Sequence, residues 1–364
     1  MKRRIVTAIV MATMTLSLLA GCAGSSGSSE SSTTSEATQE ESTAAAESTS
    51  DEGPVIGYIC KDLSQQWFIQ VTDVLTEKAK ELGAKDVILA DTSMNPEKYL
   101  TALDNMIAQG VDVIIVCPPD QQLSQATVER CNEAGVKVFA DADGLIDTDG
   151  NHIAPALELD AYKCGYSQGE WLGNYVKDNG LEEDPDTTYL VLTMDTVSSC
   201  VPRAEGAMDA FKETASKFDQ SKIIRGDYDG TSEKAFDVVA ATITANPAVK
   251  NWVVTAANEE GAQGAARALE QAGIDQNATV VGLGGYLAKD DFKKEYSCFK
   301  AAGYFMASED GEAIATAAVE WAKDDSKIPF EEYKKDGEEY GVYPLGAVMV
   351  TAENYQEIMG DDAN

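Results

Sequence analysis

The feature that most constrains the fold is the alternation, after residue 55, of short apolar runs with longer amphipathic stretches. The apolar runs are rich in Val and Ile, and they predict strands at residues 55–59, 86–90, 113–117, 136–140, 189–193, 222–225, 251–255 and 280–284. The stretches between them carry apolar residues at spacings of three and four, which predicts helices. Strands that are apolar along most of their length, each followed by a helix, indicate parallel sheets covered on both faces.

A pause in this alternation indicates two domains. Four predicted strands are followed by a polar stretch at 141–160 and a long predicted helix at 161–177, after which four more strands follow. We therefore predict an α/β protein with two doubly wound parallel-sheet domains.

Late elements indicate that the chain crosses between the two domains more than once, through a hinge. These are expected strands at 298–305 and 346–350 and an expected helix at 310–323. We expect residues 55–160 plus about 309–336 to form the N-terminal domain. Residues 161–308 plus about 337–359 are expected to form the C-terminal domain.

The N-terminus has the pattern of an export signal. Basic residues at positions 2–4 precede an apolar stretch at 5–20, which is short for a membrane span but suits a signal peptide. The stretch ends in LAGC, which resembles the bacterial lipoprotein signal, so we expect residues 1–21 to be removed and Cys22 to be lipidated. An ordinary cleaved signal with a chance cysteine is the alternative. Residues 22–54, rich in Ser, Thr, Glu and Ala, are expected to be a flexible tether, and the protein to be anchored on the outer side of the bacterial cytoplasmic membrane.

Charge and composition exclude several classes of function. The chain carries 62 acidic and 28 basic residues, a formal net charge of −34, so phosphate backbones and anionic lipid surfaces would be repelled. The single histidine, His152, and the absence of CxxC pairs argue against the usual Cys/His zinc sites, and we expect no metal site, although an acid-rich metal-binding surface is the alternative to a merely solvated one. No GxGxxG motif and no Ser/His/Asp or Cys/His arrangement is present, so we expect neither a cofactor nor enzymatic activity. Six cysteines follow Cys22; one disulfide is possible, but the spacing does not choose it.

Polar and aromatic residues follow several predicted strands. Lys61 and Asp62 come after the first strand, and Trp67 and Phe68 open the next helix. Other residues at strand ends are Cys117, Asp120, Asp141, Asp143, Asn258, Glu259, Glu260 and Tyr286. Because ligands of open parallel sheets bind at the carboxyl ends of the strands, these groups predict a shared cleft for a neutral polyhydroxylated ligand. Each group also has a structural alternative: a solvated turn, a packed core aromatic or a helix cap.

Several stretches together resemble a known family. GYICKDLSQQWF, DVIIVCPPDQQL, GVKVFADADG, RAEGAMDAF and VVGLGG are similar to the type I periplasmic sugar-binding proteins, most of all to the L-arabinose-binding branch, and the likeness extends in order over residues 55–359. The resemblance implies the type I periplasmic binding protein fold. It also implies a monomer that captures a monosaccharide or related polyol by hinge closure and delivers it to the permease of an ABC importer.

The resemblance assigns site residues position by position. Those that match the family pattern are Lys61, Trp67, Phe68, Cys117, Asp143 and Asn258. Four departures concern ligand positions: Gln65 replaces a glutamate, Ala142 replaces a carboxylate beside Asp141, Val201 replaces an arginine with Arg203 two residues on, and Tyr286 replaces an asparagine. The expected ligand-binding residues are therefore Lys61, Gln65, Trp67, Phe68, Cys117, Asp141, Asp143, Arg203, Asn258 and Tyr286. The departures disfavour arabinose itself and leave a pentose, hexose or other polyol as the class.

Two related functions use the same fold. A receptor of this fold presents a bound sugar or furanose signal to a sensor kinase or chemoreceptor, and its cleft chemistry is the same as that of a transport protein. A sugar-sensing repressor would need an N-terminal DNA-binding helix pair, where this chain has a signal and an acidic tether.

The lipoprotein signal makes a direct prediction. Mass spectrometry of the protein from its native membrane should find a lipid-modified N-terminal Cys22, and Cys22→Ala should be unlipidated. Wild-type protein that begins at an unmodified residue 23 or later would contradict this expectation.

Overall fold

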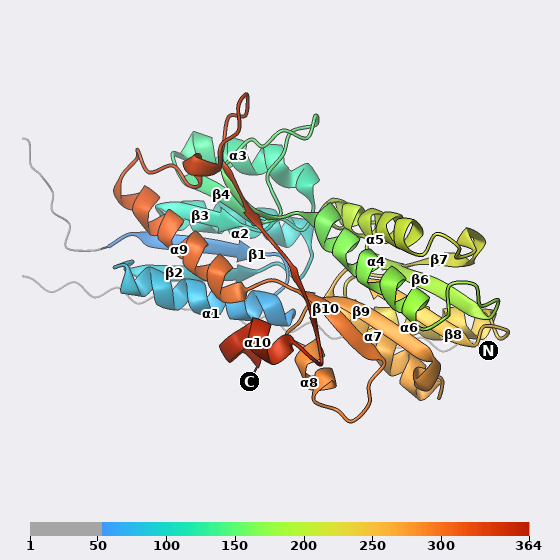
Figure 1. The fold of residues 1–364 in the computed structure, drawn as a ribbon. Helices are drawn as coiled ribbons and strands as arrows, with labels where there is room; N and C mark the ends of the chain where they lie inside the picture. Colours follow the sequence, from blue (N-terminus) through green and yellow to red (C-terminus); the bar gives the residue numbers. More distant parts are fainter. Residues whose placement is uncertain (1–52, 364) are drawn as a thin grey trace, which may run out of the picture. The chain divides into compact units, whose positions relative to one another are not determined.

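The computed structural model describes residues 53–363, which form one contiguous unit of tertiary contacts. The expected signal peptide, Cys22 and almost all of the expected tether lie outside the described residues. Within residues 53–363 the chain forms two six-stranded sheets. Figure 1 shows helices packed on both faces of each sheet, as the apolar strand pattern predicts.

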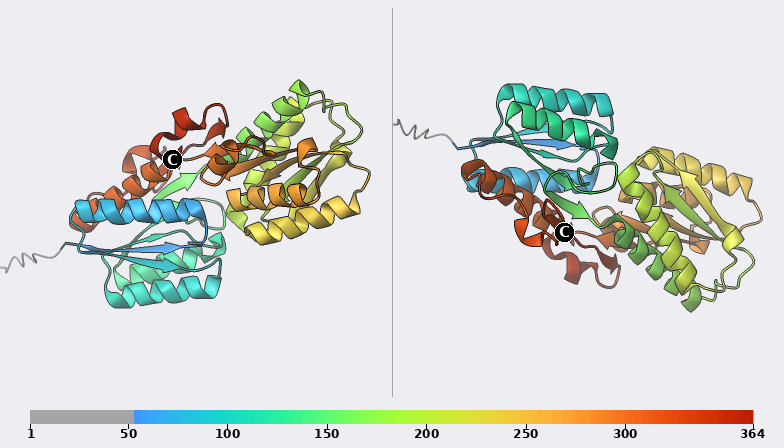
Figure 2. Two further views of the ribbon diagram at one scale, coloured as in Figure 1. Left: turned by 90° about the horizontal axis from the view of Figure 1, so that it is seen from below. Right: turned by 90° about the horizontal axis from the view of Figure 1, so that it is seen from above.

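The first sheet is parallel throughout, in the order β11-β5-β4-β3-β1-β2. Its strands are β1 (Val55–Cys60), β2 (Asp86–Asp91), β3 (Val113–Val116), β4 (Lys137–Ala142), β5 (Ala156–Leu159) and β11 (Val342–Leu345). Its helices are α1 (Gln66–Glu81), α2 (Pro96–Gln109), α3 (Ser124–Ala134) and α9 (Ala307–Lys323). Helices α1 and α9 pack side by side on one face (Figures 1 and 2).

The second sheet has the order β12-β10-β9-β8-β6-β7 and is parallel except for the antiparallel pair β10–β12. Its strands are β6 (Thr187–Thr193), β7 (Ile223–Asp227), β8 (Asn251–Ala256), β9 (Ala278–Gly284), β10 (Phe299–Tyr304) and β12 (Val348–Thr351). Its helices are α4 (Ala161–Asp178), α5 (Val201–Thr214), α6 (Ser232–Ala245), α7 (Glu259–Gln271), α8 (Ala288–Phe292) and α10 (Tyr355–Met359). Helix α4 packs against α5, and helix α6 packs against α7 (Figure 2).

Local sequence explains where the helices begin and end. Asn95 caps α2 by accepting hydrogen bonds from the backbone N–H groups of residues 97 and 98, and Pro96 occupies the first turn. Helix α2 ends at Gly110 and α3 at Gly135, both left-handed with φ of 72° and 70°. Strands β3, β6 and β9 are buried at every position, as strands covered on both faces must be.

Three connections run between the sheets: Leu159 to Ala161, Tyr304 to Ala307, and Leu345 to Val348. The first two lie close to the expected positions. The third corrects an expected boundary, because β11 pairs with β5 of the first sheet and so belongs to the N-terminal domain, not to the C-terminal domain as a crossing near residue 336 would require.

The sequence also missed β5, which lies inside the stretch taken as a polar connection. Its four residues, ALEL, follow a proline and include one glutamate. A run of four residues is too short to show an alternating pattern. Each sheet therefore has more strands than the repeat pattern alone indicated.

Helices α4 and α5 approach each other unusually closely, through glycines. A Cβ built on Gly165 would lie 1.8 Å from the carbonyl oxygen of Arg203, and one on Gly169 would lie 2.0 Å from that of Ala207. No side chain fits at these distances, so the glycines allow α4 to lie directly against α5. This contact fixes the position of the helix that carries Arg203.

We predict that Gly169→Ala lowers the free energy of unfolding by about 2 kcal/mol, because the added methyl group must push two packed helices apart. The expected loss is opposite in sign to the intrinsic helix preference for alanine over glycine. Glu170→Ala, at an exposed position of the same helix, is the control and should change stability by less than about 0.5 kcal/mol. Urea unfolding measures both, and a Gly169→Ala protein as stable as the control would contradict the close packing.

Candidate functional site

A pocket, part of it open to solvent, lies between the two domains. Its lining from the N-terminal domain is Lys61, Gln65, Trp67, Phe68, Ala142 and Leu159. Its lining from the C-terminal domain and the second crossing is Met194, Cys200, Arg203, Asn258, Glu259, Glu260, Leu283, Gly284 and Phe305. Most of these residues lie at or just beyond the carboxyl ends of β1, β4, β5, β6, β8, β9 and β10. The cleft predicted from the strand ends is therefore present.

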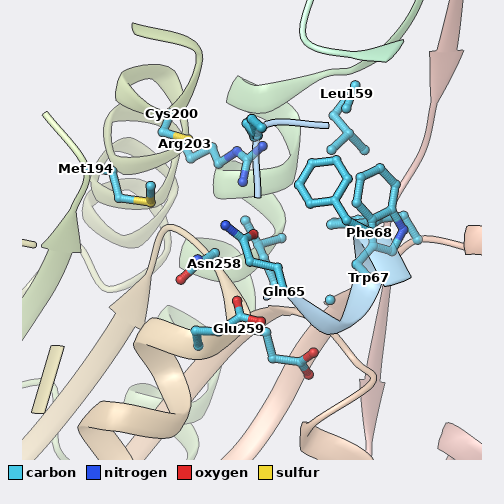
Figure 3. Close-up of a pocket in the computed structure, with 15 residues that line it drawn as sticks. Gln65, Trp67, Phe68, Leu159, Met194, Cys200, Arg203, Asn258 and Glu259 are labelled. Atoms are coloured by element: carbon cyan, nitrogen blue, oxygen red, sulfur yellow. The ribbon is translucent and has the colours of Figure 1, made fainter. Parts of the chain in front are cut away.

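Aromatic rings form one wall of the pocket, which Figure 3 shows opposite Met194 and Arg203. The ring centroids of Trp67 and Phe68 are 4.9 Å apart, and those of Trp67 and Phe305 are 5.2 Å apart, both in edge-to-face arrangements. The indole Nε1 of Trp67 has no hydrogen-bond partner in the structure, although the side chain is only 8% exposed. A wall of this kind suits the C–H face of a sugar ring, and the unpaired N–H is a donor without an acceptor.

Lys61 and Asp143 form an ion pair that is almost wholly buried behind this wall. Burial disfavours the charged form of Lys61, but the Asp143 carboxylate outweighs that effect and raises the lysine pKa above its usual range. Burial likewise opposes ionisation of Asp143, yet Lys61 and then Arg203 hold its pKa below the usual range. The thiol Sγ of Cys117 lies 3.6 Å from Asp143 Oδ2. Asp143 and Cys117 do not themselves line the pocket, and they support Lys61 from behind.

Asn258 lines the pocket and also caps helix α7. Its Oδ1 accepts hydrogen bonds from the Gly261 N–H at 2.9 Å and the Tyr228 hydroxyl at 2.5 Å. Its Nδ2 donates to the Gly230 carbonyl at 2.8 Å. One amide N–H remains for a ligand.

Two neighbouring carboxyl groups line the pocket beside Asn258. Burial raises the pKa of Glu259 to about 8 and that of Glu260 to about 7. Glu259 Oε1 accepts a hydrogen bond from the Ala288 N–H at 2.9 Å and so holds the turn after β9. Glu260 Oε1 lies 3.4 Å from the Gln66 N–H, at the first turn of α1, and so connects the two domains across the pocket.

Two further expected ligand residues, besides Asp143 and Cys117, lie outside the pocket. Asp141 is fully buried, and its Oδ2 accepts a hydrogen bond from the Tyr58 hydroxyl at 2.6 Å. The Tyr286 hydroxyl accepts from the Ala307 N–H at 2.8 Å, at the second crossing, and lies 3.1 Å from Asp362 Oδ2. Both residues therefore brace the structure around the pocket.

The sequence did not select several lining residues. Glu259 and Glu260 were in the right place at the end of β8, but acidic residues in the first turn of a helix are also ordinary dipole partners. The apolar members Leu159, Met194, Leu283 and Phe305 carry no chemical signal in a sequence, because core residues look the same.

Other kinds of site are absent from the part of the chain that the structure describes. Residues 53–363 contain no group of three or more His, Cys, Asp or Glu side chains placed to hold a metal ion. None of the helices in this range has the length and apolar character needed to cross a bilayer. The six described cysteines are buried and unpaired.

Comparison with known proteins agrees with the resemblance seen in the sequence. Residues 56–324 match the family model of the periplasmic binding protein domain. The ABC transporter L-arabinose-binding periplasmic protein of Azospirillum brasilense is 29% identical over 75% of this chain and 82% of its own length. The L-arabinose-binding periplasmic protein of Escherichia coli is 25% identical over 86% of this chain and 92% of its own. The crystal structure of the Caulobacter myo-inositol binding protein has the same fold, with a TM-score of 0.69 at 22% identity over 84% of this chain and 97% of its own.

Asp141 and Asp310 make the stability of the protein pH-dependent. Burial raises the pKa of Asp141 to about 6 and that of its neighbour Asp310 well above the usual range, and the Asp141 carboxylate further opposes ionisation of Asp310. Because the folded state binds more protons than the unfolded chain, the free energy of unfolding should fall as pH rises above about 4. The slope should be at most about 1.4 kcal/mol per pH unit for each proton.

Asp310→Asn should remove most of this slope, since the amide cannot ionise and can donate to Asp141. Asp73→Asn, at an exposed position, is the control and should leave the slope unchanged. Urea unfolding between pH 4 and pH 8 measures the slope. If the free energy of unfolding falls with pH equally in wild type and Asp310→Asn, the prediction is refuted.

Proposed function

Because the chain belongs to the periplasmic binding protein domain family, we propose that it captures a monosaccharide or related polyol between its two domains and delivers it to an ABC importer. The observation that carries the proposal is a pocket lined from both domains at the carboxyl ends of their strands. The relatives named for L-arabinose and the neighbour that binds myo-inositol support this ligand class.

Different groups of lining residues suit different faces of the ligand. The aromatic wall of Trp67, Phe68 and Phe305 would cover the apolar face of a sugar ring. Hydroxyl groups would face Lys61, Gln65, Arg203, Asn258 and Glu260, which offer both donors and acceptors.

The other expected residues act indirectly in this proposal. Asp143 and Cys117 orient the Lys61 ammonium and keep it charged. Asp141 and Tyr286 support the sheet and the second crossing. The contact set is therefore smaller than the sequence indicated.

Ligand-driven closure is the proposed mechanism. Two polar contacts between the domains are long: Glu260 Oε1 lies 3.4 Å from the Gln66 nitrogen, and the Ser198 hydroxyl lies 3.4 Å from Gln121 Oε1. A neutral hydrogen bond contributes about 1 kcal/mol net and one with a charged group about 1.5–3 kcal/mol, so several such bonds suffice for micromolar binding near −8 kcal/mol. A ligand held by only one domain would bind the open and closed forms equally, and it would not shift the equilibrium between them.

The proposed location is extracytoplasmic. The relatives named above are periplasmic proteins, and the signal sequence and Cys22 support attachment to the outer side of the cytoplasmic membrane through a lipid. We propose that the protein acts there as a monomer and presents its closed form to the permease.

Trp67 is the sharpest test of the pocket. Trp67→Ala should weaken binding of the best ligand from a thermal-shift screen of pentoses, hexoses and polyols at least about tenfold, because the ligand loses its stacking surface. Its cost in unfolding free energy should stay below the roughly 3–5 kcal/mol of a core aromatic.

Trp171→Ala is the matched control, since this indole stacks on Tyr175 along α4, outside the pocket. It should leave affinity unchanged. Unaltered affinity in Trp67→Ala, with a large loss of stability, would make Trp67 a core residue and contradict the proposed site.

A further inference from the structure

The pocket contains a buried arginine, Arg203, that has no direct ion pair among the described residues. Arg203 is only 8% exposed, yet no carboxylate of residues 53–363 lies within 4.0 Å of its guanidinium nitrogens. Buried arginines are almost always paired, because removing a charge from water costs several kcal/mol unless an opposite charge compensates. Among the described residues Arg203 therefore has no direct ion-pair partner, and Asp143 attracts it only from beyond that distance.

The hydrogen bonds of Arg203 show where that partner would bind. Nη1 donates to the Ala257 carbonyl at 2.9 Å, which fixes the plane of the guanidinium. Nε is buried without a partner, and Nη2 makes no hydrogen bond within the described chain. Nε and Nη2 share one edge of the guanidinium, and two parallel N–H groups on one edge match the two oxygens of a carboxylate. Figure 3 shows this side chain pointing into the pocket.

No nearby protein carboxylate is free to serve. Asp143 is ion-paired with Lys61 and attracts Arg203 only from a longer distance, so one carboxylate is shared between the two cations. Glu259 accepts the Ala288 N–H, and Glu260 points to the Gln66 N–H on the other side. Burial also raises the pKa of both glutamates, which favours their neutral forms.

We propose that the ligand is an acidic monosaccharide, and that its carboxylate docks on the Nε–Nη2 edge of Arg203. This inference rests on the proposed function and narrows its substrate class from sugars in general to sugar acids. A neutral hydroxyl could accept one hydrogen bond from this edge, but it would leave the buried charge uncompensated. The remaining hydroxyls of the acid would face Asn258 and Gln65, and its C–H face would lie against Trp67.

The test compares sugars that differ at a single position. L-Arabinose, D-galactose and D-galacturonate share the configuration of three ring carbons and differ in what C5 carries: hydrogen, a hydroxymethyl group or a carboxylate. D-Xylose, D-glucose and D-glucuronate form a second series of the same kind. Calorimetric titration of the full mature protein should find that the acid of at least one series binds roughly tenfold or more tightly than its neutral members.

Arg203→Gln should abolish the preference for the acid, because it should weaken binding of the acid roughly tenfold or more beyond any loss that it causes for the neutral sugars of the same series. Arg225→Gln is the matched control: Arg225 pairs with Asp195 on the surface of the same domain, and its loss should leave the preference intact. Because the preference is measured in the wild type, the test stands even if Arg203→Gln folds poorly.

The outcomes separate this inference from the function beneath it. A neutral sugar or polyol that binds more tightly than its acid in both series would overturn the acidic ligand and leave the sugar-binding function standing. Failure of all neutral and acidic probes to bind would contradict the proposed function and the inference together. An acid preference that persists in Arg203→Gln would assign the carboxylate to another group and also overturn the proposal.

Discussion

Everything in this structure depends on the chain passing three times between two parallel sheets. Because of these crossings, the loops that follow the carboxyl ends of the strands lie together between the two sheets. Polar and aromatic groups from separate parts of the sequence therefore meet there. The Tyr286 hydroxyl bonds the backbone of the second crossing at Ala307, and Phe305 of the same crossing packs on Trp67. The hinge and the pocket wall are thus built from the same few residues.

Each domain contributes fixed charges to the pocket. Lys61 and Asp143 neutralise each other, which holds the ammonium at a fixed place and leaves its remaining N–H groups for hydrogen bonds. Arg203 is held from behind by the Ala257 carbonyl and positioned by the close contact of α4 with α5. Because each of these charges is held by its own domain, little reorganisation within a domain is needed on binding.

Sequence reasoning predicted the layers of the fold well because strand and helix periods repeat over many residues. It failed at β5 and β11, whose four-residue runs are too short to carry a period, and so the third crossing was placed too early. In the pocket, Lys61, Gln65, Trp67, Phe68, Arg203 and Asn258 were found from strand ends and family resemblance. Asp141 and Tyr286 were not separable from them, because a sequence does not show which way a side chain at a strand end points.

The central claim is that one ligand touches both domains at once. A crystal structure of the protein with its tightest-binding sugar or sugar acid tests this most directly. The account predicts a closed form in which the ring lies against Trp67 of the N-terminal domain while Arg203 and Asn258 of the C-terminal domain contact its polar groups. A ligand bound to one domain only, or bound outside this pocket, would contradict it.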